Sequence, residues 1–104
     1  MSTKGPYATM AAAGTTLAGA NEVVADIAMV TSGTGGVRLD ALNVGEERVV
    51  INGINGTSAI DLNVYPVSGG SINNATASSP LVLPQNKAVR FKAIDGAGNV
   101  AAFF

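Results

Sequence analysis

The chain has 104 residues, with six basic and seven acidic side chains and a net charge of −1. It has no histidine and no cysteine, which excludes disulfides, thiol nucleophiles, imidazole bases and the commonest metal ligands. The basic residues are scattered and no apolar run approaches the roughly 20 residues that cross a bilayer. We therefore expect a single domain that binds neither nucleic acid nor a membrane.

Charged residues make up 12% of the chain, against about 25% in an average soluble domain. Asparagine, serine, threonine and glycine could keep such a surface hydrated. The alternative is a surface that a partner, or further copies of the chain, cover. We expect the second arrangement, because a small domain without disulfides commonly gains stability from assembly.

Residues 1–21 show no apolar stripe of helical period. The segment is rich in alanine, but its glycines and the Thr15-Thr16 pair disfavour a helix and also a signal peptide. We expect an extended N-terminal arm, weakly packed on a β domain formed by residues 22–104, with a disordered tail as the alternative. The arm would offer three apolar anchors to a partner: Tyr7, Met10 and Leu17.

Apolar residues recur at every second position after the arm, which is typical of strands. In the first predicted strand the inward residues are Val23, Ala25, Ile27 and Met29. The turn residues of Thr31–Gly36 precede a second strand, in which Val37, Leu39 and Ala41 point inward. The short apolar run Arg48–Ile51 predicts a third strand, covered on both faces.

Turn residues also separate the later strands. Two Asn-Gly steps within residues 52–56 favour tight turns, and Asp95–Gly98 is a further predicted turn. The strands predicted between and after these turns are Ile60–Tyr65, Leu81–Leu83, Lys87–Ile94 and Val100–Phe104.

Six or seven short strands without a long helical period predict an all-β fold. We expect an antiparallel β-sandwich or a small β-barrel, with the extended N-terminal arm attached. The predicted core residues are Val23, Ile27, Leu39, Val50, Leu62, Val64, Val89 and Phe91.

Three motifs could suggest chemistry, and each has a simpler interpretation. Gly33–Gly36 lacks the Gly-Lys-Ser/Thr ending of a phosphate-binding loop, so it indicates a β-turn. Asp95–Asn99 holds one carboxylate where a calcium loop needs several oxygen ligands. Glu46 and Glu47 are adjacent and would point to opposite faces of a strand, so they cannot form an acid–base pair. We therefore expect no catalytic, metal-binding or cofactor-binding residue, no cofactor and no enzymatic activity.

Two stretches resemble small proteins encoded among the virion genes of tailed bacteriophages. The first runs from Ala13-Gly14-Thr15-Thr16 to Val37-Arg38-Leu39. The second, Ala59–Asn73, resembles the family signature of Ala-Leu-Asn-Val-Tyr-Pro, then Gly, then Ile-Asn, and the resemblance covers roughly residues 13 to 95. The chain departs from the family pattern at Pro80 and Pro84 and in its apolar end, Val100–Phe104, so the resemblance implies no contacts for that end.

The resemblance implies a head decoration, or cement, protein that coats an assembled icosahedral shell, commonly as homotrimers. It implies the major capsid protein as partner, the capsid exterior of the virion as location and the host cytoplasm as the place of synthesis. No functional residue is carried over, because a cement protein has contact surfaces and no reaction site. Two alternatives stay open: a tail-fibre or receptor-binding module, and a head-to-tail or tail structural component.

Overall fold

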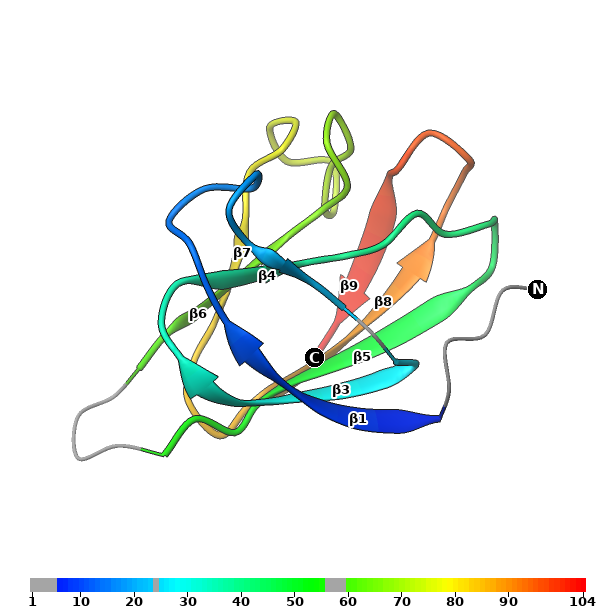
Figure 1. Ribbon diagram of the computed structural model, residues 1–104. Helices are drawn as coiled ribbons and strands as arrows, with labels where there is room; N and C mark the ends of the chain where they lie inside the picture. The colour runs from blue at the N-terminus through cyan, green and yellow to red at the C-terminus, as the bar shows by residue number, and fades with distance from the viewer. Residues whose placement is uncertain (1–5, 24, 56–59) are drawn as a thin grey trace.

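The computed structural model describes residues 6–23, 25–55 and 60–104, which form nine strands and no helix, arranged in two sheets (Figure 1). The five-stranded sheet has the order β1 (Tyr7–Ala12), β3 (Ile27–Gly33), β5 (Glu47–Asn52), β8 (Ala88–Ala93) and β9 (Val100–Phe103). The four-stranded sheet has the order β2 (Asn21–Glu22), β4 (Gly36–Arg38), β6 (Leu62–Tyr65) and β7 (Leu81–Leu83). The all-β prediction is confirmed. Among the described residues there is no helix that could span a membrane.

The first six strands alternate between the two sheets along the chain (Figure 1). Each strand that returns to a sheet therefore runs in the same direction as the previous strand of that sheet. The resulting parallel pairs are β1–β3, β3–β5, β2–β4 and β4–β6. The other three pairs, β5–β8, β6–β7 and β8–β9, are antiparallel. The prediction of an antiparallel fold was thus wrong. The turn at Gly33–Gly36 carries the chain across to the other sheet instead of closing a hairpin, and neither sheet closes into a barrel over the described residues.

Inward side chains of both sheets meet in one apolar core, in which Phe91, Leu62 and Val50 are fully buried. Seven of the eight predicted core residues are buried there, the others being Val23, Leu39, Val64 and Val89. Ile27 is the error, since its side chain is 39% exposed while Ala28 and Val30 are buried. The chain bends at residues 25–26 before β3 begins, so the alternation that starts at Val23 does not continue across the bend.

The described part of the predicted arm is built into the domain. Strand β1 pairs with β3 from Tyr7 opposite Ile27 to Ala12 opposite Gly33, and Ala12 is buried in the core. An extended, weakly packed arm is therefore not confirmed for residues 6–21. An alanine-rich edge strand gives little hydrophobic alternation, which is why its sequence resembled a tail. Residues 1–5 and the end of the second Asn-Gly step, at Gly56, lie outside the described residues.

Candidate functional site

The candidate site is the side of the five-stranded sheet that points away from the core. In-register residues of neighbouring strands place their side chains on one face of a sheet. One row across all five strands is Tyr7, Ile27, Val49, Arg90 and Phe103. The next row is Thr9, Met29, Ile51 and Ala88. These nine residues are called the outer face below.

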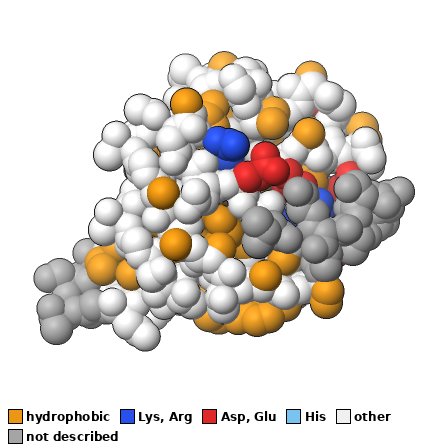
Figure 2. All heavy atoms as spheres, in the orientation of Figure 1, with side chains coloured by type: hydrophobic (Ala, Val, Ile, Leu, Met, Phe, Trp, Pro, Cys, Tyr) orange, Lys and Arg blue, Asp and Glu red, His pale blue; other side chains and the backbone are white. Residues whose placement is uncertain are grey.

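Eight of the nine outer-face residues are uncharged, and the large side chains are open to solvent. Tyr7 is 53% exposed, Ile27 39% and Phe103 46%, while Met29 and Val49 are half-buried. Figure 2 shows hydrophobic side chains gathered along the lower rim of the molecule, below β1 and β3 in that view. An apolar sheet face of this extent is typical of a surface that another protein covers.

Charges lie towards the β8 side of the outer face. The Arg90 guanidinium sits 5.0 Å from the centre of the Phe103 ring, a cation–π arrangement. Glu47 approaches Arg90 at 3.8 Å and Lys92 at 3.9 Å, and all three side chains are 40% exposed or more. Exposed pairs of this length contribute little to stability. The outer-face residues of β1, β3 and β5 are uncharged, and Glu47 of β5 with Arg90 and Lys92 of β8 forms a polar border beside them, which is the usual anatomy of a protein interface.

The opposite side of the molecule is more polar. There the outward residues of the four-stranded sheet include Glu22, Arg38 and Asn63. Arg38 donates to the carbonyl of Ala20 at 3.0 Å and lies 3.9 Å from Glu22, beside a hollow of about 400 Å³. The five-stranded sheet therefore has the more apolar outward side.

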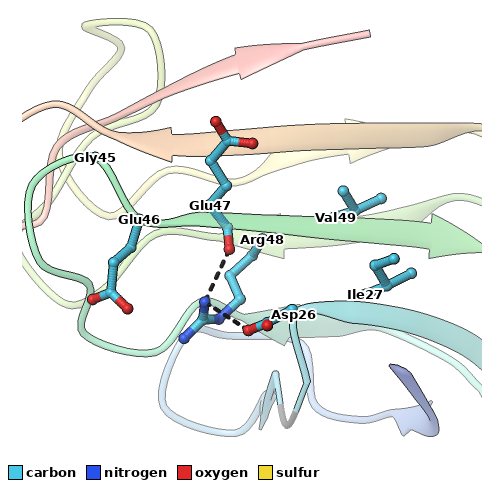
Figure 3. A pocket seen from close by; sticks show the side chains of 7 residues that line it. All are labelled: Asp26, Ile27, Gly45, Glu46, Glu47, Arg48 and Val49. Atoms are coloured by element: carbon cyan, nitrogen blue, oxygen red, sulfur yellow. Dashed lines mark hydrogen bonds and ion pairs between the residues drawn. The ribbon is translucent and has the colours of Figure 1, made fainter. Parts of the chain in front are cut away.

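A second hollow, of about 390 Å³, lies at one end of the outer face, where Ile27 and Val49 meet a group of charged side chains (Figure 3). Arg48 lies 3.1 Å from the Asp26 carboxylate and donates to the Glu47 carbonyl at 2.9 Å. Figure 3 shows the Glu46 and Glu47 side chains pointing apart, as the sequence predicts, so they do not form an acid–base pair. These charges are engaged with neighbouring protein groups, which favours a structural role.

The burial of two of these charged residues was not predicted. Arg48 is 2% exposed and Glu46 is 5% exposed. The Glu46 carboxylate accepts a 2.6 Å hydrogen bond from the Asn43 N–H. Among the described residues, no group of three or more potential ligands is placed to hold a metal ion.

No protein-family model, curated protein or solved structure matches this chain.

The three predicted anchors are not brought together. Tyr7 lies on the outer face, with its hydroxyl 3.8 Å from the Met29 sulfur. Met10 is on the opposite face of β1 and packs against the core, and Leu17 lines the hollow beside Arg38. Sequence reasoning missed the rest of the outer face, although the run Val49–Ile51 carried the signal. A strand that is apolar on both faces needs a cover on both, and the fold supplies a core on one side only.

Proposed function

We propose that this protein is a bacteriophage head decoration, or cement, protein that binds the assembled shell and stabilises it. The outer face is the observation that carries the proposal, and the resemblance of residues 13–95 to virion proteins supplies the partner. In this proposal the two sheets are the layers of a β-sandwich. The five-stranded layer rests on the major capsid protein, and the more polar four-stranded layer faces solvent on the capsid exterior.

The mechanism we propose is non-catalytic and needs neither cofactor, nucleic acid nor membrane. Each copy covers its apolar outer face with capsid surface, and the exclusion of water from apolar area drives the contact. A copy that bridges neighbouring capsid subunits makes many weak contacts at once, so its overall affinity for the shell exceeds that of any single contact. Because the protein would bind only the assembled shell, it would stabilise that state by mass action. The resemblance implies homotrimers, and this stays a prediction.

Two other virion roles would use an apolar face in the same way: a tail-fibre or receptor-binding module and a head-to-tail or tail component. Location separates them from decoration. Gold-labelled antibody against the protein, applied to intact virions, should label the whole head. Label confined to the tail or its fibres would contradict the proposal and favour one of these alternatives.

A second experiment tests the requirement for an assembled shell. Heads prepared without the protein are mixed with it and sedimented, and unassembled major capsid protein is the matched control. The protein should pellet with heads at a saturating stoichiometry and show no association with the unassembled subunit. Equal binding to both would contradict the proposed mechanism, because such binding would not favour the assembled state.

A further inference from the structure

Three of the four sheet edges in the described structure are protected against pairing with another strand. At β9, Val100 exchanges backbone hydrogen bonds with Ser71 and Asn73, each 2.9 Å long, and the Asn73 side chain accepts the Ala102 N–H at 2.9 Å. Strand β7 has three residues and lies between Pro80 and Pro84. Strand β2 has two residues, one of them the charged Glu22. Short length, charge, proline and a covering loop are the usual devices that protect an edge.

Among the described residues, the fourth edge, β1, has such protection only in its second half. There a bulge interrupts the pairing with β3 between Met10 and Ala11, and the Asn21 side chain donates to the Ala11 carbonyl at 2.9 Å. The first half, Tyr7–Met10, contains no charge and no proline. Within the described part of the chain no further strand pairs with this four-residue segment, which is called the open edge below.

The orientation of the peptide groups along β1 shows which ones this edge offers. The Pro6 carbonyl accepts a hydrogen bond from the Ile27 N–H at 3.2 Å, so it points at β3. In a strand the N–H and C=O groups of one residue point to the same side, and successive residues alternate. The N–H and C=O groups of Ala8 and Met10 therefore also point at β3. The N–H and C=O groups of Tyr7 and Thr9 therefore point away from the sheet, where an additional strand would bond to them.

We propose that this edge pairs with the same edge of a second copy, antiparallel, about a two-fold axis at Ala8. Tyr7 of each copy then exchanges two backbone hydrogen bonds with Thr9 of the other. Ala8 lies opposite Ala8 of the other copy as a non-hydrogen-bonded pair, in which the two Cα atoms are close and a small side chain fits. The segment Tyr7–Met10 contains no charged residue, so antiparallel pairing with the same segment of a second copy brings no like charges together. A second copy is therefore a suitable partner for this edge. The two five-stranded sheets become one continuous sheet with a doubled outer face.

A two-fold contact of this kind produces dimers. It competes with the trimers that the resemblance implies, so the assembly state in solution decides between the two, and it does not depend on the protein being a capsid component. The inference can therefore fail while the decoration proposal stands, and the reverse also holds.

Disulfide trapping tests the register directly, because the chain has no cysteine of its own. In an antiparallel non-hydrogen-bonded pair the Cα atoms are about 4.5 Å apart, which lies within the range of disulfide geometry. Ala8→Cys in the full chain should form a covalent dimer under mild oxidation. Ala88→Cys, which is exposed on the same sheet but away from the edge, is the matched control and should not. Absence of the Ala8→Cys dimer, or equal trapping of both variants, would overturn the proposed register.

Thr9→Pro tests the edge without a disulfide. Proline removes only the N–H that points away from β3, so circular dichroism should show the parent fold while sedimentation changes from dimer to monomer. Thr9→Lys should have the same effect on association and keeps the N–H, which guards against a folding artefact of proline. A parent protein that is monomeric or trimeric in solution, or a dimer that both variants leave intact, would overturn the inference.

Discussion

Arg48 and Asp40 form a bidentate ion pair inside the domain, with Nε 3.2 Å from Oδ1 and Nη2 2.9 Å from Oδ2. Arg48 comes from β5 of the five-stranded sheet, and Asp40 follows β4 of the four-stranded sheet, so the pair links the two sheets. Both side chains are at least 95% buried. A charge buried to this degree is tolerated only with a well-placed partner, so the pair should be a sensitive point of the fold.

Removing one member of this pair should destabilise the protein strongly. Asp40→Leu leaves the Arg48 guanidinium buried with less compensation, and such losses cost about 3–5 kcal/mol. The retained contact between Arg48 and Asp26 favours the lower end of that range. Urea unfolding gives the free energy of unfolding, and Glu47→Gln, which breaks only long exposed pairs, should change it by less than about 1 kcal/mol. Equal stability of the Asp40→Leu variant and the parent would contradict this assignment.

Asn52 is a second polar link inside the core. It is fully buried, and its side-chain amide donates to the Ile60 carbonyl at 2.8 Å and to the Leu83 carbonyl at 2.9 Å. Asn52→Leu keeps the branched shape of the side chain but leaves these two carbonyls without their donor, so we expect a loss of about 1–3 kcal/mol in urea unfolding. The exposed Asn55→Ala is the control and should be close to neutral. An Asn52→Leu variant that is more stable than the parent would show that the amide is not a net stabilising link.

Gly36 makes room for an aromatic ring. A Cβ atom at this position would lie 2.7 Å from the Tyr65 ring and 2.8 Å from the Asn63 carbonyl oxygen. Tyr65 is itself held by a 3.2 Å hydrogen bond from its hydroxyl to the Thr15 carbonyl. Gly36→Ala should therefore cost about 1–3 kcal/mol through overpacking, with a lower melting temperature in calorimetry.

Gly96 is the matched control for this substitution. A Cβ there meets no atom within 4 Å and the backbone does not have a positive φ. Gly96→Ala should leave the melting temperature unchanged or raise it slightly. A similar loss of stability in both variants would mean that space at Tyr65 is not the cause.

Asp95 predicts an acid-sensitive turn. The Asn99 side chain donates to its carboxylate at 2.9 Å and the Ala97 N–H at 2.8 Å, and these bonds hold the pKa of Asp95 below its ordinary value. A carboxyl whose pKa is lowered by folding stabilises the fold when it is ionised. Its contribution is therefore complete above the unfolded pKa and is lost as the pH falls through the folded one.

An NMR titration of the Asp95 carboxyl carbon tests this directly. We expect a midpoint below the ordinary value of an aspartate. In Asn99→Ala the Asp95 midpoint should move up towards the ordinary value, because the largest cause of the shift is removed. An unchanged midpoint in that variant would contradict the assignment.

The positions of most strands could be predicted from the sequence, whereas their pairing could not. Alternation and turn residues located Leu81–Leu83, and they placed the other later strands to within two residues at either end. Turn chemistry is local, so it does not show whether Gly33–Gly36 returns the chain along its own sheet or moves it to the other one. The parallel pairs therefore appear only in three dimensions.

Burial was harder to predict where polar residues or short apolar side chains were involved. The inward positions of Arg48 and Asn52 depend on partners in other parts of the fold, Asp40 and Leu83, and the alternation pattern alone does not identify them. The alternation at Ile27 was interrupted by the bend at residues 25–26. The apolar run Val49–Ile51 indicates the outer face only when it is known that the core covers one side of β5 and leaves the other side exposed.

The proposed function requires that the outer face is the surface that binds the shell. We compare sedimentation of the parent, Ile27→Glu and Val82→Glu with heads that lack the protein. Ile27 is 39% exposed on the outer face, and Val82 is 51% exposed on the four-stranded sheet, so each places one carboxylate on the surface of a different sheet. A carboxylate that an apolar interface buries without a partner is costly to desolvate. We predict that Ile27→Glu binds heads at least tenfold more weakly and that Val82→Glu binds like the parent, whereas full binding by Ile27→Glu would contradict the account.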